Sequence, residues 1–515
     1  MKLHGKVYLV GAGPGDAGLL TLRGAELLAR ADVVLYDQLV NPDLLRLAPQ
    51  AELIHRGKGM AMPQAEITAL LIAKAREGKT VVRLKGGDPY IFGRGGEEAE
   101  ELAAAKIPFE VVPGVSSVVA APNYAGIPLT HREHCSSFTV FTGHGDPAEA
   151  TTDLRYDQIA KIPGTKVVLM GMERLDDWTK NLIAHGLPAE TPVAVVEQGT
   201  TGRQRSVAGT LATIAALAAE NNITPPALTI VGDVVKLRGK LNWFEQKPLF
   251  GRRIVVTRPS GRDAVSASRK IGDGNMPSLP RQLAERGADV LEIPTIKTVP
   301  PENLAPIADA LLELNSYDWL VFTSPNGVTT FFEYFFKAFD DLRDIGGVRI
   351  AAVGPATAAK LKELHLKVDL MPEEALAVKI AVAFAKFESI ENLNICLLRA
   401  EVANPELPQA LEALGAIVDD IACYKTVPET EDRTGAVARL LADGAEWITF
   451  TSGSTVENFH ARFDLTALVK RFPQIKIASI GPETSKALSA LGLKPAVEAR
   501  QHTIEGLVKA VEAAG

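Results

Sequence analysis

Cysteine and long apolar runs are both scarce in this chain of 515 residues. The three cysteines, Cys135, Cys396 and Cys423, lie far apart and form no CxxC pair. Disulfide frameworks, structural zinc sites and iron–sulfur clusters need closely spaced cysteines, so we expect none of them and no bound metal. No segment approaches the roughly 20 apolar residues of a membrane span, and the apolar run that ends at Val10 is shorter than a signal peptide requires. The sequence therefore predicts a cytoplasmic protein that does not enter a membrane.

Positive charge is not in excess either. The 55 lysines and arginines are outnumbered by 62 aspartates and glutamates, which gives a net charge of −7. Proteins that bind nucleic acid usually carry a basic face, so we expect no nucleic-acid partner. A small anionic substrate is compatible with this charge, because local arginines and helix N-termini can bind carboxylates. With 46% apolar residues, the length predicts three or four domains, each with its own core.

Strand-like and helix-like segments alternate through about the first 240 residues. The pattern predicts elements at 6–10, 21–31, 32–36, 63–77, 80–84, 97–106 and 109–112. This alternation is typical of an α/β fold with a largely parallel sheet. A second set begins after Cys135, and its strands at 192–197 and 205–209 are close enough for a hairpin. We therefore expect two α/β lobes, at about 1–130 and 131–241, the second with a mixed sheet.

Residues 242–251 carry a proline and a glycine without periodicity, and we interpret them as a linker. The part of the chain that follows contains an internal repeat. KTVP occurs at 297–300 and again at 425–428, and DWLVFTSPNGV at 318–328 corresponds to EWITFTSGSTV at 446–456. A βα series that occurs twice predicts two similar α/β lobes.

Three glycine-containing segments follow predicted strands in the first half: VGAGPGD at 10–16, RLKGGDPYIFGRGGEE at 83–98 and PGVSS at 113–117. Glycine allows close backbone approach and φ values that other residues avoid. Loops at the ends of parallel strands are also where α/β proteins bind ligands. A nicotinamide fingerprint is an alternative for the first segment, although its glycines alternate and no helix starts at once. A tight turn without a ligand is another. Two histidines three residues apart, His131 and His134 in HREH, could approach each other as metal ligands, but no third ligand is evident.

Together these segments resemble the uroporphyrinogen-III C-methyltransferase family over about residues 5–245. The resemblance implies the two-lobed tetrapyrrole-methylase fold, S-adenosyl-L-methionine as the methyl donor without a metal, and a homodimer formed through this half. We expect Pro14, Gly87 and Met170 to line one common cavity. The family's donor contacts fall on nine residues of this chain: Pro14, Gly86, Gly87, Asp88, Ile91, Ser116, Ser117, Met170 and Gly199.

The same resemblance implies chemical roles. The family's proton acceptor matches Asp37 and its proton donor matches Lys58, while Asp16 and Arg94 match other residues implicated in the reaction. Transfer of a sulfonium methyl group to a pyrrole carbon needs mainly positioning and the removal of a proton afterwards. The porphyrinogen substrate carries many carboxylates, and the candidates to hold them are Arg23, Arg83, Lys85, Arg94 and Arg132.

In the C-terminal half, small polar residues follow predicted strands in each lobe. Hydroxyls and free N–H groups at helix N-termini form anion sites, and several of them around a cleft would suit a polycarboxylate. Simple N-capping of the helices is the alternative. The candidate substrate-binding residues are Thr323, Ser324, Asn326 and Thr357 in one lobe, and Thr451, Ser452 and Thr484 in the other.

This half resembles uroporphyrinogen-III synthase over about residues 250–515, through the repeated FTS and GP segments and ACYKTVP. The resemblance implies a synthase at 252–515 with two flavodoxin-like lobes, 252–296 with 427–515 and 297–426. A two-stranded connector would join them, in which the KTVP repeats pair. Tyr424 matches the family's preferred tyrosine and is the candidate proton donor. The stretch 263–280 looks longer than the family's usual first loop, and we assign no role to it.

The sequence thus predicts a bifunctional enzyme of tetrapyrrole synthesis. Its C-terminal half would cyclise hydroxymethylbilane to uroporphyrinogen III, and its N-terminal half would methylate that product at C-2 and C-7 to give precorrin-2. One alternative is a C-methyltransferase whose synthase half is degenerate and non-catalytic. The others are a nicotinamide oxidoreductase, a non-catalytic tetrapyrrole carrier, and a methylase of a later corrin intermediate.

Overall fold

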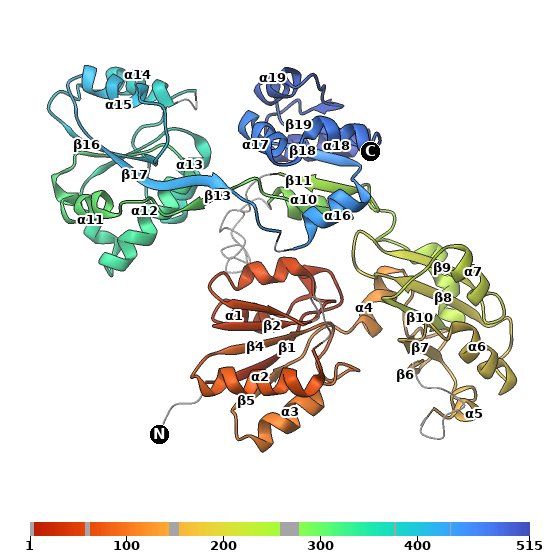
Figure 1. Ribbon diagram of the computed structural model, residues 1–515. Coiled ribbons are helices and arrows are strands. Elements are labelled where there is room, and N and C mark those ends of the chain that lie inside the picture. Colours follow the sequence, from red (N-terminus) through yellow and green to blue (C-terminus); the bar gives the residue numbers. More distant parts are fainter. Residues whose placement is uncertain (1–4, 57–61, 144–153, 258–277, 375–376, 433) are drawn as a thin grey trace. The chain divides into compact units, whose positions relative to one another are not determined.

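The computed structural model describes the chain except for residues 1–4, 57–61, 144–153, 258–277, 375–376 and 433 (Figure 1). Two units are distinguished, Met1–Ile293 with Glu431–Gly515, and Pro294–Thr430. The described residues form four five-stranded sheets, and the predicted α/β fold class is confirmed. Within the described part of the chain, no helix is both long and apolar enough to cross a membrane.

The first sheet is wholly parallel and is covered on both faces (Figure 1). Its strands are β1 (Val7–Gly11), β2 (Val33–Tyr36), β3 (Glu52–His55), β4 (Val81–Lys85) and β5 (Phe109–Val112). The helices are η1 (Ala17–Leu19), α1 (Leu22–Leu28), η2 (Pro42–Leu47), α2 (Gln64–Arg76), α3 (Gly95–Ala104) and α4 (Ser117–Tyr124).

Alternating side chains explain why helices cover both faces of this sheet, whose strand order is β3-β2-β4-β1-β5. Val10 and Val82 share one core cluster with residues of α1, whereas Leu9 and Val81 share another with residues of α2 and α3. The edge strand β3 is absent from the predicted elements, because four residues that begin with an exposed Glu52 show little apolar alternation.

The second sheet is mixed, as predicted, and has the order β6-β7-β10-β8-β9. β6 and β7 are parallel, while β10 is antiparallel to both its neighbours and β8–β9 is the predicted antiparallel hairpin. The strands are β6 (Phe138–Thr142), β7 (Thr165–Leu169), β8 (Pro192–Glu197), β9 (Arg205–Thr210) and β10 (Ala227–Val231). The helices are α5 (Tyr156–Ile159), α6 (Leu175–Ala184), α7 (Ile214–Glu220), η3 (Asp233–Leu237) and α8 (Arg238–Leu241).

Helix α4 ties the second sheet to the first. Its residues Val118 and Ala121 belong to a core cluster with Val167 of β7 and Val196 of β8. Because α4 follows β5 of the first sheet directly, this packing places the loops at the ends of β1, β4 and β5 near the second sheet.

Residues 242–251, which the sequence suggested as a linker, are packed rather than free. Phe244 and Leu249 are buried, and the rings of Tyr124 and Phe244 lie 4.7 Å apart between centroids. The Glu245 carboxylate accepts hydrogen bonds from Ser206 Oγ at 2.7 Å and Arg238 Nη2 at 2.5 Å. The segment therefore packs against the second lobe.

The third sheet belongs to the first unit and is wholly parallel. Its order, β12-β11-β18-β19-β20, is the flavodoxin-like arrangement in which the second strand lies outside the first. The strands are β11 (Arg253–Val256), β12 (Asp289–Glu292), β18 (Trp447–Phe450), β19 (Lys476–Ser479) and β20 (Val497–Glu498). The helices are α10 (Leu279–Glu285), α16 (Ala436–Asp443), α17 (Gly453–Phe463), α18 (Leu465–Arg471), α19 (Pro482–Ala490) and α20 (Ile504–Ala514).

The fourth sheet forms the second unit, with the order β13-β17-β16-β14-β15. Its strands are β13 (Ile296–Val299), β14 (Trp319–Phe322), β15 (Arg349–Ala352), β16 (Asn394–Ala400) and β17 (Ile417–Pro428). The helices are α11 (Ala305–Leu312), η4 (Leu314–Ser316), α12 (Pro325–Ala338), η5 (Leu342–Ile345), α13 (Pro355–Glu363), α14 (Ala377–Phe387) and α15 (Glu406–Ala413).

The sequence repeat has a direct structural counterpart. The repeated segments place Trp319 at the start of β14 and Trp447 at the start of β18, each a buried interior strand of its sheet. The two KTVP segments pair with each other as the antiparallel strands β13 and β17, with Thr298 opposite Thr426. The predicted pairing of the two KTVP segments is therefore confirmed.

Candidate functional site

Three loops of the first sheet meet backbone to backbone at glycines. The N–H of Gly13 donates to the carbonyl oxygen of Gly87 at 3.2 Å, and the N–H of Gly87 donates to that of Gly13 at 2.7 Å. A Cβ atom on Gly11 would lie 2.5 Å from the Cα of Gly114 and 2.6 Å from the Gly87 oxygen. Any side chain at Gly11 would thus separate the ends of β1, β4 and β5.

Two aspartates brace these loops. Asp88 accepts hydrogen bonds from the N–H of Tyr90 at 2.8 Å and from the N–H of Gly114 at 3.0 Å, one on each oxygen. Asp16 likewise accepts from the N–H of Gly18 and from the hydroxyl of Tyr124, each at 2.7 Å. Both carboxylates therefore hold the loop junction.

Several candidate donor-contact residues gather around α4. Ser116 is the N-cap of this helix, and its hydroxyl accepts a hydrogen bond from the N–H of Val118. Gly87 lies against Ser116, since an added Cβ would be 3.8 Å from the Ser116 Cα. At Gly199 an added Cβ would come within 2.5 Å of the Ala121 Cβ, so only glycine allows this loop of the second lobe to approach α4 so closely.

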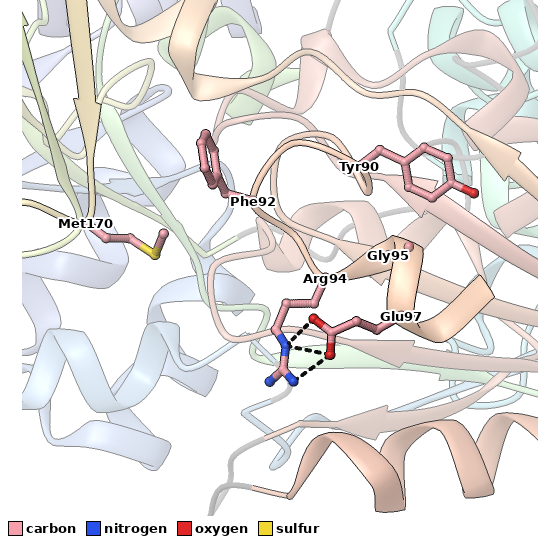
Figure 2. A pocket seen from close by; sticks show the side chains of 7 residues that line it. Tyr90, Phe92, Arg94, Gly95, Glu97 and Met170 are labelled. Carbon is pink, nitrogen blue, oxygen red and sulfur yellow. Dashed lines mark hydrogen bonds and ion pairs between the residues drawn. The ribbon is translucent and has the colours of Figure 1, made fainter. Parts of the chain in front are cut away.

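A cavity of about 430 Å³ opens between the loop after β4 and the end of β7 (Figure 2). Figure 2 shows the Met170 side chain, which comes from the second lobe, pointing toward the loop that carries Phe92 and Arg94. Of the three residues expected to share one cavity, Met170 lines this one, whereas Pro14 and Gly87 do not. The mutual hydrogen bonds of Gly13 and Gly87 draw those loops together instead. The lining residues are Tyr90, Phe92, Arg94, Gly95, Gly96, Glu97 and Met170.

The backbone around this cavity is held in an uncommon conformation. Phe92, Arg94 and Met170 have φ values of 52°, 56° and 52°, in the left-handed region that non-glycine residues rarely adopt. Such strain persists only where the surrounding structure imposes it, and it is concentrated at functional sites. The strained residues also leave apolar surface open, because the Phe92 and Met170 side chains are about half exposed.

Arg94 and Glu97 form a bidentate ion pair at the rim of the cavity (Figure 2). Arg94 Nε lies 3.0 Å from Glu97 Oε1, and Nη2 lies 2.7 Å from Oε2. The hydrogen bonds from Arg94 hold the pKa of the Glu97 carboxyl below its usual value of 4.5. Glu97 was not among the predicted residues, although its position three residues after Arg94 in a helical segment could have indicated the pair.

Asp37 lies directly after β2 and is paired with arginines. Its Oδ1 accepts from Arg83 Nη2 at 2.5 Å and from Arg56 Nη1 at 3.4 Å. The other predicted proton-transfer residue of this half, Lys58, lies outside the described residues.

Arg83 and Lys85 cannot hold substrate carboxylates as predicted, because both are completely buried and bind Glu98. Sequence alone gave no sign of their burial. Among the remaining basic candidates, Arg23 pairs with Glu110 at the surface, at 3.1 Å, and Arg132 is exposed.

In the fourth sheet, the N-terminus of α12 carries the predicted polar loop. The Ser324 hydroxyl caps the helix by accepting from the N–H of Gly327 at 3.1 Å. It also lies 2.9 Å from the hydroxyl of Tyr424 on β17. Burial raises the pKa of Tyr424, and the hydrogen bond with Ser324 opposes that rise. Asn326 is exposed beside them, and Thr323 is half-buried.

The third sheet has the equivalent loop at α17. Ser452 caps this helix in a reciprocal capping box with Thr455, and Thr451 is half-buried. The paired candidates Thr357 and Thr484 are each only 3% exposed. Their hydroxyls are therefore withdrawn from the surface, and the structural role, packing at the start of α13 and α19, fits them better than direct contact with a substrate.

The cysteines and the histidine pair show no sign of a metal centre. Cys135, Cys396 and Cys423 are free thiols. The rings of His131 and His134 lie 4.9 Å apart between centroids. Within the described ranges, no group of three or more His, Cys, Asp or Glu residues is placed to hold a metal ion.

Two family models match the chain in succession. The model of tetrapyrrole (corrin/porphyrin) methylases matches residues 6–215, and that of uroporphyrinogen-III synthase HemD matches residues 278–509. A porphyrin biosynthesis protein HemD of Ruminiclostridium josui is 38% identical over 511 residues, which cover 98% of this chain and 97% of the relative. The chain therefore belongs to the same family as this relative. It is an enzyme of tetrapyrrole biosynthesis that joins a uroporphyrinogen-III C-methyltransferase to a uroporphyrinogen-III synthase.

Other relatives match part of the fused chain. A uroporphyrinogen-III C-methyltransferase of Bacillus subtilis (strain 168) is 41% identical over 415 residues, or 79% of this chain and 82% of the relative. The crystal structure of a uroporphyrin-III C-methyltransferase from Thermus thermophilus, complexed with S-adenosyl homocysteine, is 43% identical. It covers 45% of this chain and all of that one, with a TM-score of 0.39.

Proposed function

We propose that the C-terminal half closes linear hydroxymethylbilane to uroporphyrinogen III with loss of water, and that the N-terminal half methylates this product at C-2 and C-7 to give precorrin-2. The observation that carries the proposal is the presence of both family matches on one chain, where the product of the second enzyme is the substrate of the first. Tyr424 does not support the alternative of a non-catalytic synthase half. Its hydroxyl lies 2.9 Å from that of Ser324, the N-cap residue of α12.

We infer that S-adenosyl-L-methionine binds between the loop after β4 and Met170. The residues there fit such a donor, since Ile91, Phe92 and Met170 expose apolar surface and Gly96 has open space beside its backbone. When bound, the donor supplies an electrophilic methyl group. The Thermus thermophilus relative is complexed with S-adenosyl homocysteine, the compound that this donor becomes once its methyl group is transferred. No bound metal enters the proposal.

The side chains of this half have distinct tasks in the proposal. Arg94, about half exposed, can exchange Glu97 for a carboxylate of the porphyrinogen, because both anions suit its planar guanidinium. Once the new carbon–carbon bond has formed and the methyl–sulfur bond has broken, the methylated pyrrole ring carries a positive charge. Loss of a proton from this ring to the Asp37 carboxylate removes that charge.

In the synthase half, Tyr424 donates a proton to the departing hydroxyl of hydroxymethylbilane, which leaves as water. Ser324 fixes the orientation of the phenol at 2.9 Å. The polar loops at α12 and α17 offer N–H groups and hydroxyls to the substrate carboxylates. Thr323, Asn326 and Thr451 remain the accessible candidates for this contact.

Three further expectations belong to the proposal. The domain limits are 1–241 for the methylase, 242–251 for the packed connecting segment and 252–515 for the synthase. The methylase half forms a homodimer, which sedimentation of the purified protein tests. The free thiols of all three cysteines support a reducing, cytoplasmic location.

Incubation of the purified chain with hydroxymethylbilane and S-adenosyl-L-methionine, followed by mass and isomer analysis, tests both activities. We expect a doubly methylated type-III product, and unmethylated uroporphyrinogen III when the donor is omitted. Methylation of supplied uroporphyrinogen III, together with only the type-I isomer from hydroxymethylbilane, would identify a non-catalytic synthase half. Saturable NADH binding without donor binding would instead favour an oxidoreductase.

A further inference from the structure

Four charged side chains form a continuous network of ion pairs inside the first lobe. Arg83 and Lys85 lie two residues apart on β4 and therefore point to the same face. Glu98 of α3 covers them, and Asp37 after β2 lies at the outer end. The side chains of Arg83 and Glu98 are 0% exposed, that of Lys85 1% and that of Asp37 21%. Of the four members of this network, Asp37 is therefore the one that reaches the surface.

The geometry uses every nitrogen of the Arg83 guanidinium. Its Nε donates to Glu98 Oε1 at 3.2 Å, its Nη1 to the Leu84 carbonyl at 3.3 Å, and its Nη2 to Asp37 Oδ1 at 2.5 Å. Lys85 Nζ donates to the same Glu98 oxygen at 2.8 Å. Because a planar guanidinium has fixed donor directions, these contacts allow it one orientation.

Such a buried arrangement of charges costs stability. Removing ionised groups from water carries a free-energy penalty, which pairing offsets only when the geometry is good. Burial and the neighbouring Arg83 lower the pKa of Lys85 from its usual value of 10.5. Apolar residues would fill the same interior at lower cost, so the position of Arg83 beneath Asp37 needs a functional reason.

We infer that Arg83 is a positioning residue for methyl transfer: anchored by Glu98, it holds the Asp37 carboxylate in one orientation for proton removal from the methylated macrocycle. This inference rests on the proposed role of Asp37. Arg83 and Arg56 both bind Oδ1. Among the hydrogen bonds of the described residues, none reaches Asp37 Oδ2, which leaves that oxygen for the substrate proton.

Arg83 has no access to the substrate itself. Its guanidinium is fully buried behind Asp37, and it stays protonated in proteins, so it neither binds substrate carboxylates nor transfers a proton. Its effect on the reaction must therefore pass through Asp37. The Oε1 atom of Glu98 accepts hydrogen bonds from both Arg83 Nε and Lys85 Nζ. Glu98 and Lys85 therefore act on the reaction through Arg83.

A double-mutant cycle on the full chain tests the inference, with kcat for methylation of supplied uroporphyrinogen III as the readout. Arg83→Lys keeps the buried positive charge but cannot bind Asp37 and Glu98 in the same fork. We expect kcat to fall roughly 10- to 100-fold, since misplacement of a reacting group by about 1 Å costs that much. The KM for S-adenosyl-L-methionine should be unchanged, because Arg83 does not reach the cavity.

The decisive comparison is Arg83→Lys in the Asp37→Asn background. If Arg83 acts through Asp37, the substitution has no further effect there, whereas a purely structural role would multiply the two losses. Multiplicative losses would overturn the inference while leaving Asp37 as the base. Wild-type kcat in Asp37→Asn alone would instead overturn the proposed role of Asp37.

Two controls keep the outcome readable. Arg30→Lys changes an exposed arginine whose ion pair, among the described residues, is with Glu26 on α1, and we expect wild-type kcat from it. If Arg83→Lys does not fold, as judged by loss of donor binding, the paired variant Arg83→Gln with Glu98→Gln removes one buried charge of each sign. This variant should bind the donor and show the same non-additivity with Asp37→Asn; multiplicative losses would count against the inference.

Discussion

The glycine junction of the methylase half permits a quantitative prediction for Gly11→Ala. The added Cβ would lie 2.5 Å from two backbone atoms of Gly114 and 2.6 Å from the Gly87 oxygen. Ordinary carbon contacts need about 3.5–4.0 Å, so the loops must separate by roughly 1 Å. None of the three atoms belongs to a flexible side chain, and hence no cheap local adjustment exists.

That separation breaks the two hydrogen bonds between Gly13 and Gly87, which measure 2.7 and 3.2 Å. Each such bond contributes about 0.5–1.5 kcal/mol, and overpacking costs about 1–3 kcal/mol. Two such bonds and the overpacking together give a loss of about 2–6 kcal/mol at the junction for Gly11→Ala. Since about 1.4 kcal/mol corresponds to a tenfold change in affinity, the two hydrogen bonds alone, at about 1–3 kcal/mol, predict that the donor binds roughly 5- to 150-fold more weakly.

Isothermal titration with S-adenosyl-L-methionine measures the affinity, and synthase turnover of the same preparation reports on the other half of the chain. The matched control is Gly239→Ala, because an added Cβ at this exposed position of α8 meets nothing within 4 Å. That variant should keep wild-type affinity and gain up to about 1 kcal/mol of stability. Donor affinity in Gly11→Ala equal to that of the control would refute the steric argument.

Two further predictions concern Tyr424 and Glu245. Tyr424→Phe should slow hydroxymethylbilane cyclisation by roughly 10²- to 10⁴-fold and leave methylation of supplied uroporphyrinogen III intact; cyclisation within twofold of wild type would place the acid elsewhere. Burial raises the pKa of Glu245, but hydrogen bonds from Arg238, Gln204 and Ser206 outweigh it and lower the pKa below 4.5. The carboxylate therefore stabilises the fold above about pH 4.5 and ceases to do so as the pH falls through the lowered value. Glu245→Gln should flatten this acid dependence in urea unfolding, and an unchanged slope would contradict the assignment.

The fold class and the order of elements followed largely from local patterns. The strands β5 and β8 have the predicted limits, Phe109–Val112 and Pro192–Glu197, because buried strands between turn residues leave a clear apolar signal. The resemblance to uroporphyrinogen-III synthase implied that the two KTVP segments pair, and the structure pairs them with Thr298 opposite Thr426. The short edge strand β3 escaped prediction, since edge strands need not be apolar.

The site depended more on tertiary structure. The motifs identified the loops that meet around Gly11 and Gly87, because a family signature is a property of sequence. The partners of the charged residues could not be read in the same way. Arg83 and Lys85 looked like substrate contacts until the structure placed Glu98 over them. Strand alternation states that two side chains share a face, but only the packing of α3 decides whether that face meets water, substrate or a buried carboxylate.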